Sequence, residues 1–148
     1  QKCPKWIIGV ELVAREYLGY WESKGWDDTA AVRMATRINQ PEAGDALPAG
    51  KYRISGSAFD GGNHGGIERV EISTDGGETW HDANIWGSGH IRSWYLWEYE
   101  WAVPEGARTA KVLARSIGAD GEVQTSTPED GPPRGATGYH TLEVDISA

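Results

Sequence analysis

Apolar and polar residues alternate along several short stretches of this chain. No stretch keeps the spacing of three and four residues that is typical of an amphipathic helix. In residues 51–60, Tyr52, Ile54, Gly56 and Ala58 would share one face, with polar residues between them. Similar strand-like stretches occur at residues 67–74, 94–101, 109–117, 122–125 and 141–147. The pattern predicts an all-β fold, an antiparallel sandwich of about seven strands.

Glycine and proline separate these stretches, as turn and loop signals do. Residues 61–66 form a glycine-rich loop, and Ala119-Asp120-Gly121 is a candidate hairpin turn. Residues 125–138 contain several prolines, so they cannot form a central strand and are expected to be a long loop before the last strand. No internal repeat is evident, which speaks against a propeller or a solenoid.

The first thirty residues differ from the rest of the chain. Residues 5–14 alternate as one strand would, and residues 16–26 are aromatic and irregular, unlike a solvated linker. A segment of this kind is expected to lie against another protein surface. We therefore interpret residues 1–30 as the tail of a preceding domain and a crossover, and residues 31–148 as the sandwich.

Charge and hydropathy narrow the possible partners. The formal net charge of −8 argues against nucleic acid, because phosphates require clustered Lys and Arg. It also disfavours anionic membranes, and no run approaches the roughly 20 apolar residues that a membrane span needs. We therefore expect neither nucleic-acid binding nor membrane contact by this segment.

Aromatic residues are unusually frequent, with eight Trp and six Tyr. We interpret the surplus as core plus a protein interface, where aromatic side chains contribute large buried areas. The alternative is a carbohydrate-binding module, in which exposed rings stack on sugars. A glycosidase would need two carboxylates roughly 5–10 Å apart across a cleft, and nothing in the sequence indicates such a pair.

Residues with catalytic or metal-binding chemistry are scattered. Cys3 is the only cysteine, so no internal disulfide and no Cys-based zinc cluster can form. The four histidines show no metal-ligand spacing. Asp27-Asp28 and Glu129-Asp130 are adjacent in sequence, which does not make an acid/base pair. We therefore expect no catalytic residue and no metal ligand in this chain.

The sharpest local motif is Ser73-Thr74-Asp75-Gly76-Gly77-Glu78-Thr79-Trp80. Its spacing matches a hairpin turn in which Asp75 caps backbone amides, Gly77 supplies conformational freedom and Trp80 packs underneath. Such turns repeat on the blades of sialidase-like propellers, but this chain has one copy. The motif therefore predicts a structural turn.

Several segments, taken in order, resemble one known family, the C-terminal dimerisation domain of sulfite-oxidase-like molybdenum (molybdopterin) oxidoreductases. The matching segments are Lys5-Trp6-Ile7-Ile8, residues 19–26, Arg37-Ile38-Asn39-Gln40-Pro41, residues 54–62 and 67–80, Trp94 with Trp97, Ala114-Arg115-Ser116, Asp120-Gly121 with Gln124, and residues 135–140. The resemblance covers nearly the whole chain.

The resemblance implies an immunoglobulin-like sandwich of the E-set type that pairs with its twin in a homodimer and is not catalytic by itself. The parent would be a molybdenum-dependent oxidoreductase acting on a small oxyanion such as sulfite. Its molybdopterin and molybdenum would be bound in the upstream domain, so no cofactor is expected on this chain. Arg134, in an Arg-Gly step before the last strand, matches an arginine that contacts the substrate anion in sulfite oxidases. The compartment stays open, with an extracytoplasmic parent, periplasmic or membrane-anchored, favoured.

Overall fold

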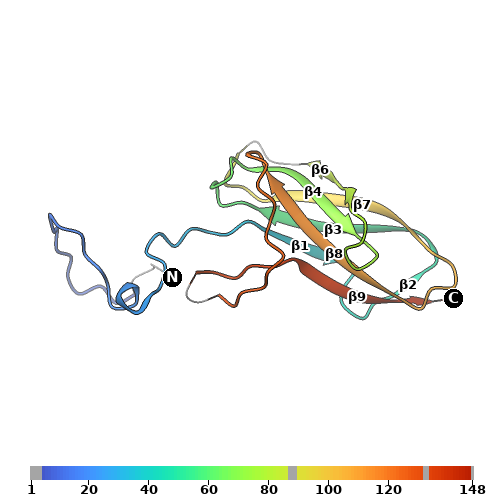
Figure 1. Ribbon diagram of the computed structural model, residues 1–148, viewed down its shortest axis with the longest axis horizontal. Helices are drawn as coiled ribbons and strands as arrows, with labels where there is room; N and C mark the ends of the chain where they lie inside the picture. The colour runs from blue at the N-terminus through green and yellow to red at the C-terminus, as the bar shows by residue number, and fades with distance from the viewer. Residues whose placement is uncertain (1–4, 87–89, 132–133, 148) are drawn as a thin grey trace.

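Two β-sheets packed face to face make up the body of the molecule (Figure 1). The computed structural model describes residues 5–86, 90–131 and 134–147, and within these it contains nine strands. The four-stranded sheet has the order β1 (Ala35–Gln40), β3 (Gly50–Phe59), β7 (Tyr95–Val103), β6 (Asn84–Trp86). The five-stranded sheet has the order β2 (Ala46–Pro48), β9 (His140–Ser147), β8 (Thr109–Gly118), β4 (Ile67–Ser73), β5 (His81–Asp82).

This architecture confirms the predicted all-β, immunoglobulin-like sandwich. Six strands have six residues or more, whereas β2, β5 and β6 have two or three residues each. Five of the six correspond to predicted alternating stretches, and β1 contains most of the segment Arg37–Pro41 that the family resemblance singled out. All strand pairs are antiparallel except β2 with β9, which is parallel.

The core lies between the two sheets and follows the alternation of the strands. In β3, Ile54 and Ala58 are fully buried, and in β7 the fully buried residue is Trp97. Val70 and Ile72 of β4, in the five-stranded sheet, are also fully buried and belong to the same core. Because side chains alternate across a strand, each inward residue leaves its neighbours on the outer face of the sheet.

Two predicted strands are not strands in the structure. Residues 5–14 form no strand, and their side chains are exposed. A strand needs a neighbour for its N–H and C=O groups, and the sandwich supplies none here. Residues 122–125 form only the isolated bridge between Val123 and Ile117, because the side chain of Gln124 turns in to accept hydrogen bonds from Ser116.

The segment before β1 leaves the sandwich at one end (Figure 1). It contains one 3-10 turn, η1 (Glu22–Lys24), which ends at Gly25 in the left-handed conformation. The long loop between β8 and β9 extends from the same end, as the blue and orange-red parts of Figure 1 show. Among the described residues, no helix is long and apolar enough to cross a membrane.

Candidate interaction surface

Large apolar side chains gather on the outer face of the four-stranded sheet. Trp94, immediately before β7, and Leu96 of β7 are 58% and 46% exposed, and Trp86 of β6 is 46% exposed. The ring of Phe59 lies 5.0 Å from that of Trp94, and Trp86 pairs with Leu96 across the strands. We call the set of Phe59, Trp86, Trp94 and Leu96 the aromatic patch. Contiguous exposed apolar surface of this kind marks an interaction site.

The same face carries an ordered arrangement of charge beside the aromatic patch. Its basic residues, Lys51 and Arg53, lie on β3, and its acidic residues, Glu98 and Glu100, lie on the neighbouring β7. Lys51 Nζ lies 2.7 Å from Glu100 Oε1, and Arg53 Nη1 lies 3.5 Å from Glu98 Oε2. The hydrogen bond and charge of Glu100 raise the pKa of Lys51 above its ordinary value. The face therefore presents a basic strand beside an acidic strand.

A second apolar surface lies on the N-terminal segment. Trp6, Ile8 and Leu12 are exposed, and so are Tyr17 and Trp21. The rings of Trp21 and Trp26 lie 5.1 Å apart and contact each other, not the sandwich core. This segment is separate from the aromatic patch, so the described residues present two apolar surfaces.

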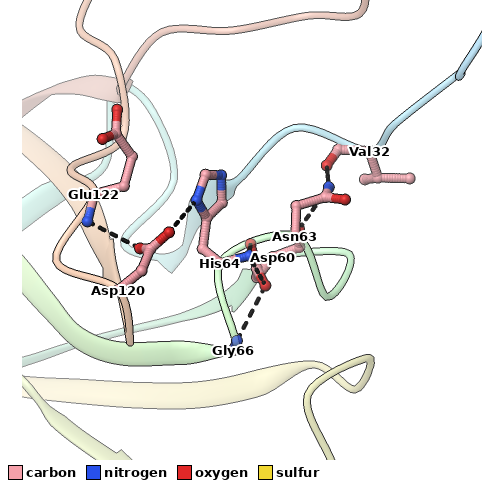
Figure 2. Close-up of polar contacts among 7 residues, drawn as sticks. All are labelled: Val32, Asp60, Asn63, His64, Gly66, Asp120 and Glu122. Atoms are coloured by element: carbon pink, nitrogen blue, oxygen red, sulfur yellow. Dashed lines mark hydrogen bonds and ion pairs between the residues drawn. The ribbon is translucent and has the colours of Figure 1, made fainter.

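The end of the sandwich from which this segment leaves is held by polar contacts (Figure 2). The carboxylate of Asp60 is fully buried and accepts hydrogen bonds from the backbone N–H groups of His64 and Gly66 at 3.0–3.1 Å. The amide of Asn63 donates to the carbonyl oxygen of Val32 at 2.7 Å. The buried carboxylate thus shapes the glycine-rich loop, and the loop fixes the chain where it enters β1.

His64 connects this loop to the next one. His64 Nδ1 lies 3.0 Å from Asp120 Oδ2, and Asp120 also accepts the backbone N–H of Glu122. The hydrogen bond from Glu122, followed by that of His64, lowers the pKa of Asp120. Asp120 lies within the turn that was predicted at Ala119-Asp120-Gly121, where the N–H of Gly121 donates to the carbonyl of Gly118. These contacts brace the loops against each other.

The motif of residues 73–80 forms a turn stabilised by its own side chains. Asp75 accepts the backbone N–H of Thr79 at 3.0 Å and also accepts the hydroxyl of Thr79. The hydroxyl of Ser73 accepts the N–H of Gly77 at 2.8 Å. Gly77 has a φ of 101°, which favours glycine. The hydrogen bonds from Thr79, with that of Ser73, hold the pKa of Asp75 far below its ordinary value.

Trp80, at the end of this turn, packs against the outer face of the five-stranded sheet. The guanidinium of Arg115 lies 4.0 Å from the ring centroid of Trp80, and the Tyr139 ring meets Trp80 edge-on at 5.4 Å. Arg115 also pairs with Glu71 at 2.7 Å. Trp80, Arg115 and Tyr139 line a groove of about 530 Å³. Because Arg115 covers one ring face and Glu71 neutralises its charge, Trp80 is not a free platform for a sugar.

Arg134 lies in the long loop between β8 and β9 and is exposed. Its backbone carbonyl accepts a hydrogen bond from Arg33 Nε at 3.4 Å, which places it beside the chain that leaves the sandwich. Its role as an anion contact stays a prediction.

The described residues contain no group of three His, Cys, Asp or Glu side chains that could hold a metal ion. Cys3 lies outside the described residues.

Sequence reasoning found part of the aromatic patch. The alternation within residues 94–101 puts Trp94 and Leu96 on the face opposite Trp97, but it does not indicate Phe59 and Trp86 as their neighbours. Phe59 follows the alternation of β3 on the outer side. Trp86 lies in a strand of three residues, too short for a periodic signal.

Comparison with known proteins defines the class. A sequence model of the family described as "Mo-co oxidoreductase dimerisation domain" matches residues 27–130. The mitochondrial sulfite oxidase of Homo sapiens is 28% identical over 125 residues, which are 76% of this chain and 23% of that protein. The sulfite oxidase of Gallus gallus is 30% identical over 122 residues, 74% of this chain and 26% of that protein.

A solved structure agrees with the fold. The crystal structure of the sulfane dehydrogenase SoxCD from Paracoccus pantotrophus aligns with a TM-score of 0.59 at 20% identity, over 79% of this chain and 33% of that chain. The chain thus belongs to the Mo-co oxidoreductase dimerisation domain family and is a dimerisation domain of the sulfite-oxidase-like type. It spans about a quarter of the length of the two sulfite oxidases above. The comparisons do not support the carbohydrate-binding alternative.

Proposed function

We propose that this chain holds two copies of a longer molybdenum-cofactor oxidoreductase together, and that the sandwich itself makes the contact. The family match over residues 27–130 supports this role. The sulfite oxidases that it resembles are several times longer than this chain, which supports a parent protein with a further domain. Molybdopterin and molybdenum belong to that further domain, and a small oxyanion such as sulfite is the substrate class of the parent.

One observation carries the proposal: the described residues expose large apolar side chains on two separate surfaces. The aromatic patch lies on the outer face of a sheet. The apolar residues of the N-terminal segment lie on a part of the chain that extends from the sandwich (Figure 1). Each surface requires a partner, because exposing so much apolar area to water is unfavourable. We assign the sheet face to a second copy of the chain, and the N-terminal segment to the preceding domain of the same polypeptide.

The oligomeric state of two chains tests this assignment. Sedimentation velocity should be measured on the 148-residue chain and on a chain that begins at residue 31, which lacks the exposed N-terminal segment. We expect both to sediment as dimers at micromolar concentration, because the sandwich is present in both. A chain from residue 31 that is folded by circular dichroism but stays monomeric would overturn the proposal, since association would then depend on the N-terminal segment.

A further inference from the structure

The four-stranded sheet offers a face whose two halves complement each other, and this bears on how two copies meet. We propose that a second copy of the chain packs face to face on the outer side of this sheet, an inference that rests on the proposed function. The two-fold axis runs along the strands, between β3 and β7. In this contact, specific side chains of β1, β3, β6 and β7 meet those of the second copy.

The strand register arranges the outward side chains in rows across the sheet. One row runs from Ala35 through Phe59 to the position of Trp94, and the next contains Arg37, Ser57, Leu96 and Trp86. A third pairs Ser55 with Glu98 and Asn84, and a fourth pairs Arg53 with Glu100. Each row therefore crosses from β1 and β3 on one side to β7 and β6 on the other.

A two-fold axis along the strands reverses the order within each row and keeps the rows at the same height. It therefore brings β3 of one copy over β7 of the other, and β1 over β6. In the row that runs from Ala35 to Trp94, Phe59 then meets Trp94 of the second copy. In the next row, Ser57 meets Leu96, a small side chain against a large one, and Arg37 meets the exposed ring of Trp86. Arginine over tryptophan is a favourable cation–π pair, and both residue types are enriched at interfaces.

The same two-fold axis also brings opposite charges together. The axis places the basic strand β3 over the acidic strand β7, so Arg53 of each copy faces Glu100 of the other. Lys51 lies one row further along, opposite Ala102 and diagonal to Glu100, and Glu98 lies opposite Ser55 and diagonal to Arg53. Lys51 and Glu100 are 80% and 67% exposed, so their charges are available to a second copy as well as to each other. The chain has a net charge of −8, and two copies repel each other in general. Matched charges on this face offset that repulsion where the copies touch.

This self-complementarity favours a second copy over other occupants. A two-fold contact uses one surface twice and therefore requires the surface to match its own rotated image. The outer face of the four-stranded sheet matches its rotated image in three rows, which pair Phe59 with Trp94, Arg37 with Trp86, and Arg53 with Glu100. A preceding domain or a sugar would require no such relation between β3 and β7.

Charge reversal tests the contact through mixing. In the basic variant, Glu98→Lys and Glu100→Lys make both strands positive. In the acidic variant, Lys51→Glu and Arg53→Glu make both strands negative. Each variant alone would place like charges opposite each other, and we expect its dimer dissociation constant to rise by at least about tenfold. Mixed in equal amounts, the two should form a heterodimer, because β3 and β7 then carry basic side chains in one copy and acidic side chains in the other.

The matched control reverses two acidic residues on the other sheet, Glu143→Lys and Asp145→Lys on the outward side of β9. We expect this variant to dimerise as the unchanged chain does. Thermal unfolding should confirm that every variant is folded. A dimeric unchanged chain whose basic and acidic variants also dimerise alone would overturn this contact and leave the proposed function standing. A monomeric unchanged chain would overturn both.

Discussion

Gly56 occupies one of the closest contacts in the sandwich. A Cβ atom built on Gly56 would lie 2.1 Å from the backbone oxygen of Arg37 and 2.2 Å from Cζ2 of Trp97. The alternation in β3 correctly places Gly56 on the inward face. The sequence could not show that a fully buried indole from β7 lies against it, because that depends on the register of two strands far apart along the chain.

The substitution Gly56→Ala tests this contact. Because neither a backbone oxygen nor a packed indole can move away easily, we expect the free energy of unfolding to fall by about 1–3 kcal/mol or more. Urea denaturation measures the change. Gly131→Ala is the matched control, since a Cβ there has no atom within 4 Å, and its effect should stay within about 0.5 kcal/mol. Equal effects at the two glycines would contradict the packing described.

Single residues also show where sequence reasoning succeeded and failed. The motif around Asp75 has its hydrogen bonds within eight residues, so its spacing alone describes the turn that the structure contains. The pairing of Phe59 with Trp94 joins residues that are distant along the chain, and no local pattern predicts it.

Strands were predictable where they are long enough to repeat an alternation. β3, β4, β7, β8 and β9 have seven to ten residues and were all found. The short strands β2, β5 and β6 have no period to detect. Residues 5–14 have the alternation without the strand, because alternation shows which side chains could share a face and not whether a neighbouring strand is present.

His140 links two strands that belong to different sheets. At the start of β9, its Nδ1 accepts the backbone N–H of Ile38 in β1 at 3.2 Å. This bond requires an unprotonated Nδ1. Burial, followed by the charge of Arg37, lowers the pKa of His140 below its ordinary value of 6.5. The folded state therefore favours the neutral ring.

The pH dependence of stability follows from this lowered pKa. Above about pH 6.5 the ring is neutral in both states, and the stabilisation is fully present. As the pH falls below 6.5, the unfolded chain takes up the proton first, so the free energy of unfolding decreases until the pH reaches the lower pKa of the folded state.

His140→Asn isolates this effect, because an asparagine oxygen can accept the same N–H without titrating. Urea denaturation of both chains between pH 8 and pH 5 should show the unchanged chain losing stability relative to the variant. Since the other histidines are common to both, parallel curves over this range would contradict the role assigned to His140.

At the scale of the whole molecule, the fold class and the family were predictable, whereas the interaction surface was not. Long alternating stretches were enough to predict the fold class, and the ordered set of family segments was enough to predict the family. The surface depends on which strands are neighbours, because Arg37, Phe59, Trp86 and Leu96 come from four strands or their margins. The surplus of aromatic residues predicted that such a surface exists, and the register of the sheet shows where it lies.

Distances between spin labels across the dimer test the central claim most directly. With Cys3→Ser removing the only native thiol, single cysteines at Asn84 and Glu143 would carry the labels. In the proposed dimer the four-stranded sheets face each other at about 10 Å, and β6 of one copy lies about three strand spacings from β6 of the other. Pulsed dipolar spectroscopy should therefore give roughly 17 Å between backbones at position 84. At position 143 the two outer sheets lie three layers apart, at least roughly 30 Å. A shorter distance at position 143 than at position 84 would contradict the account.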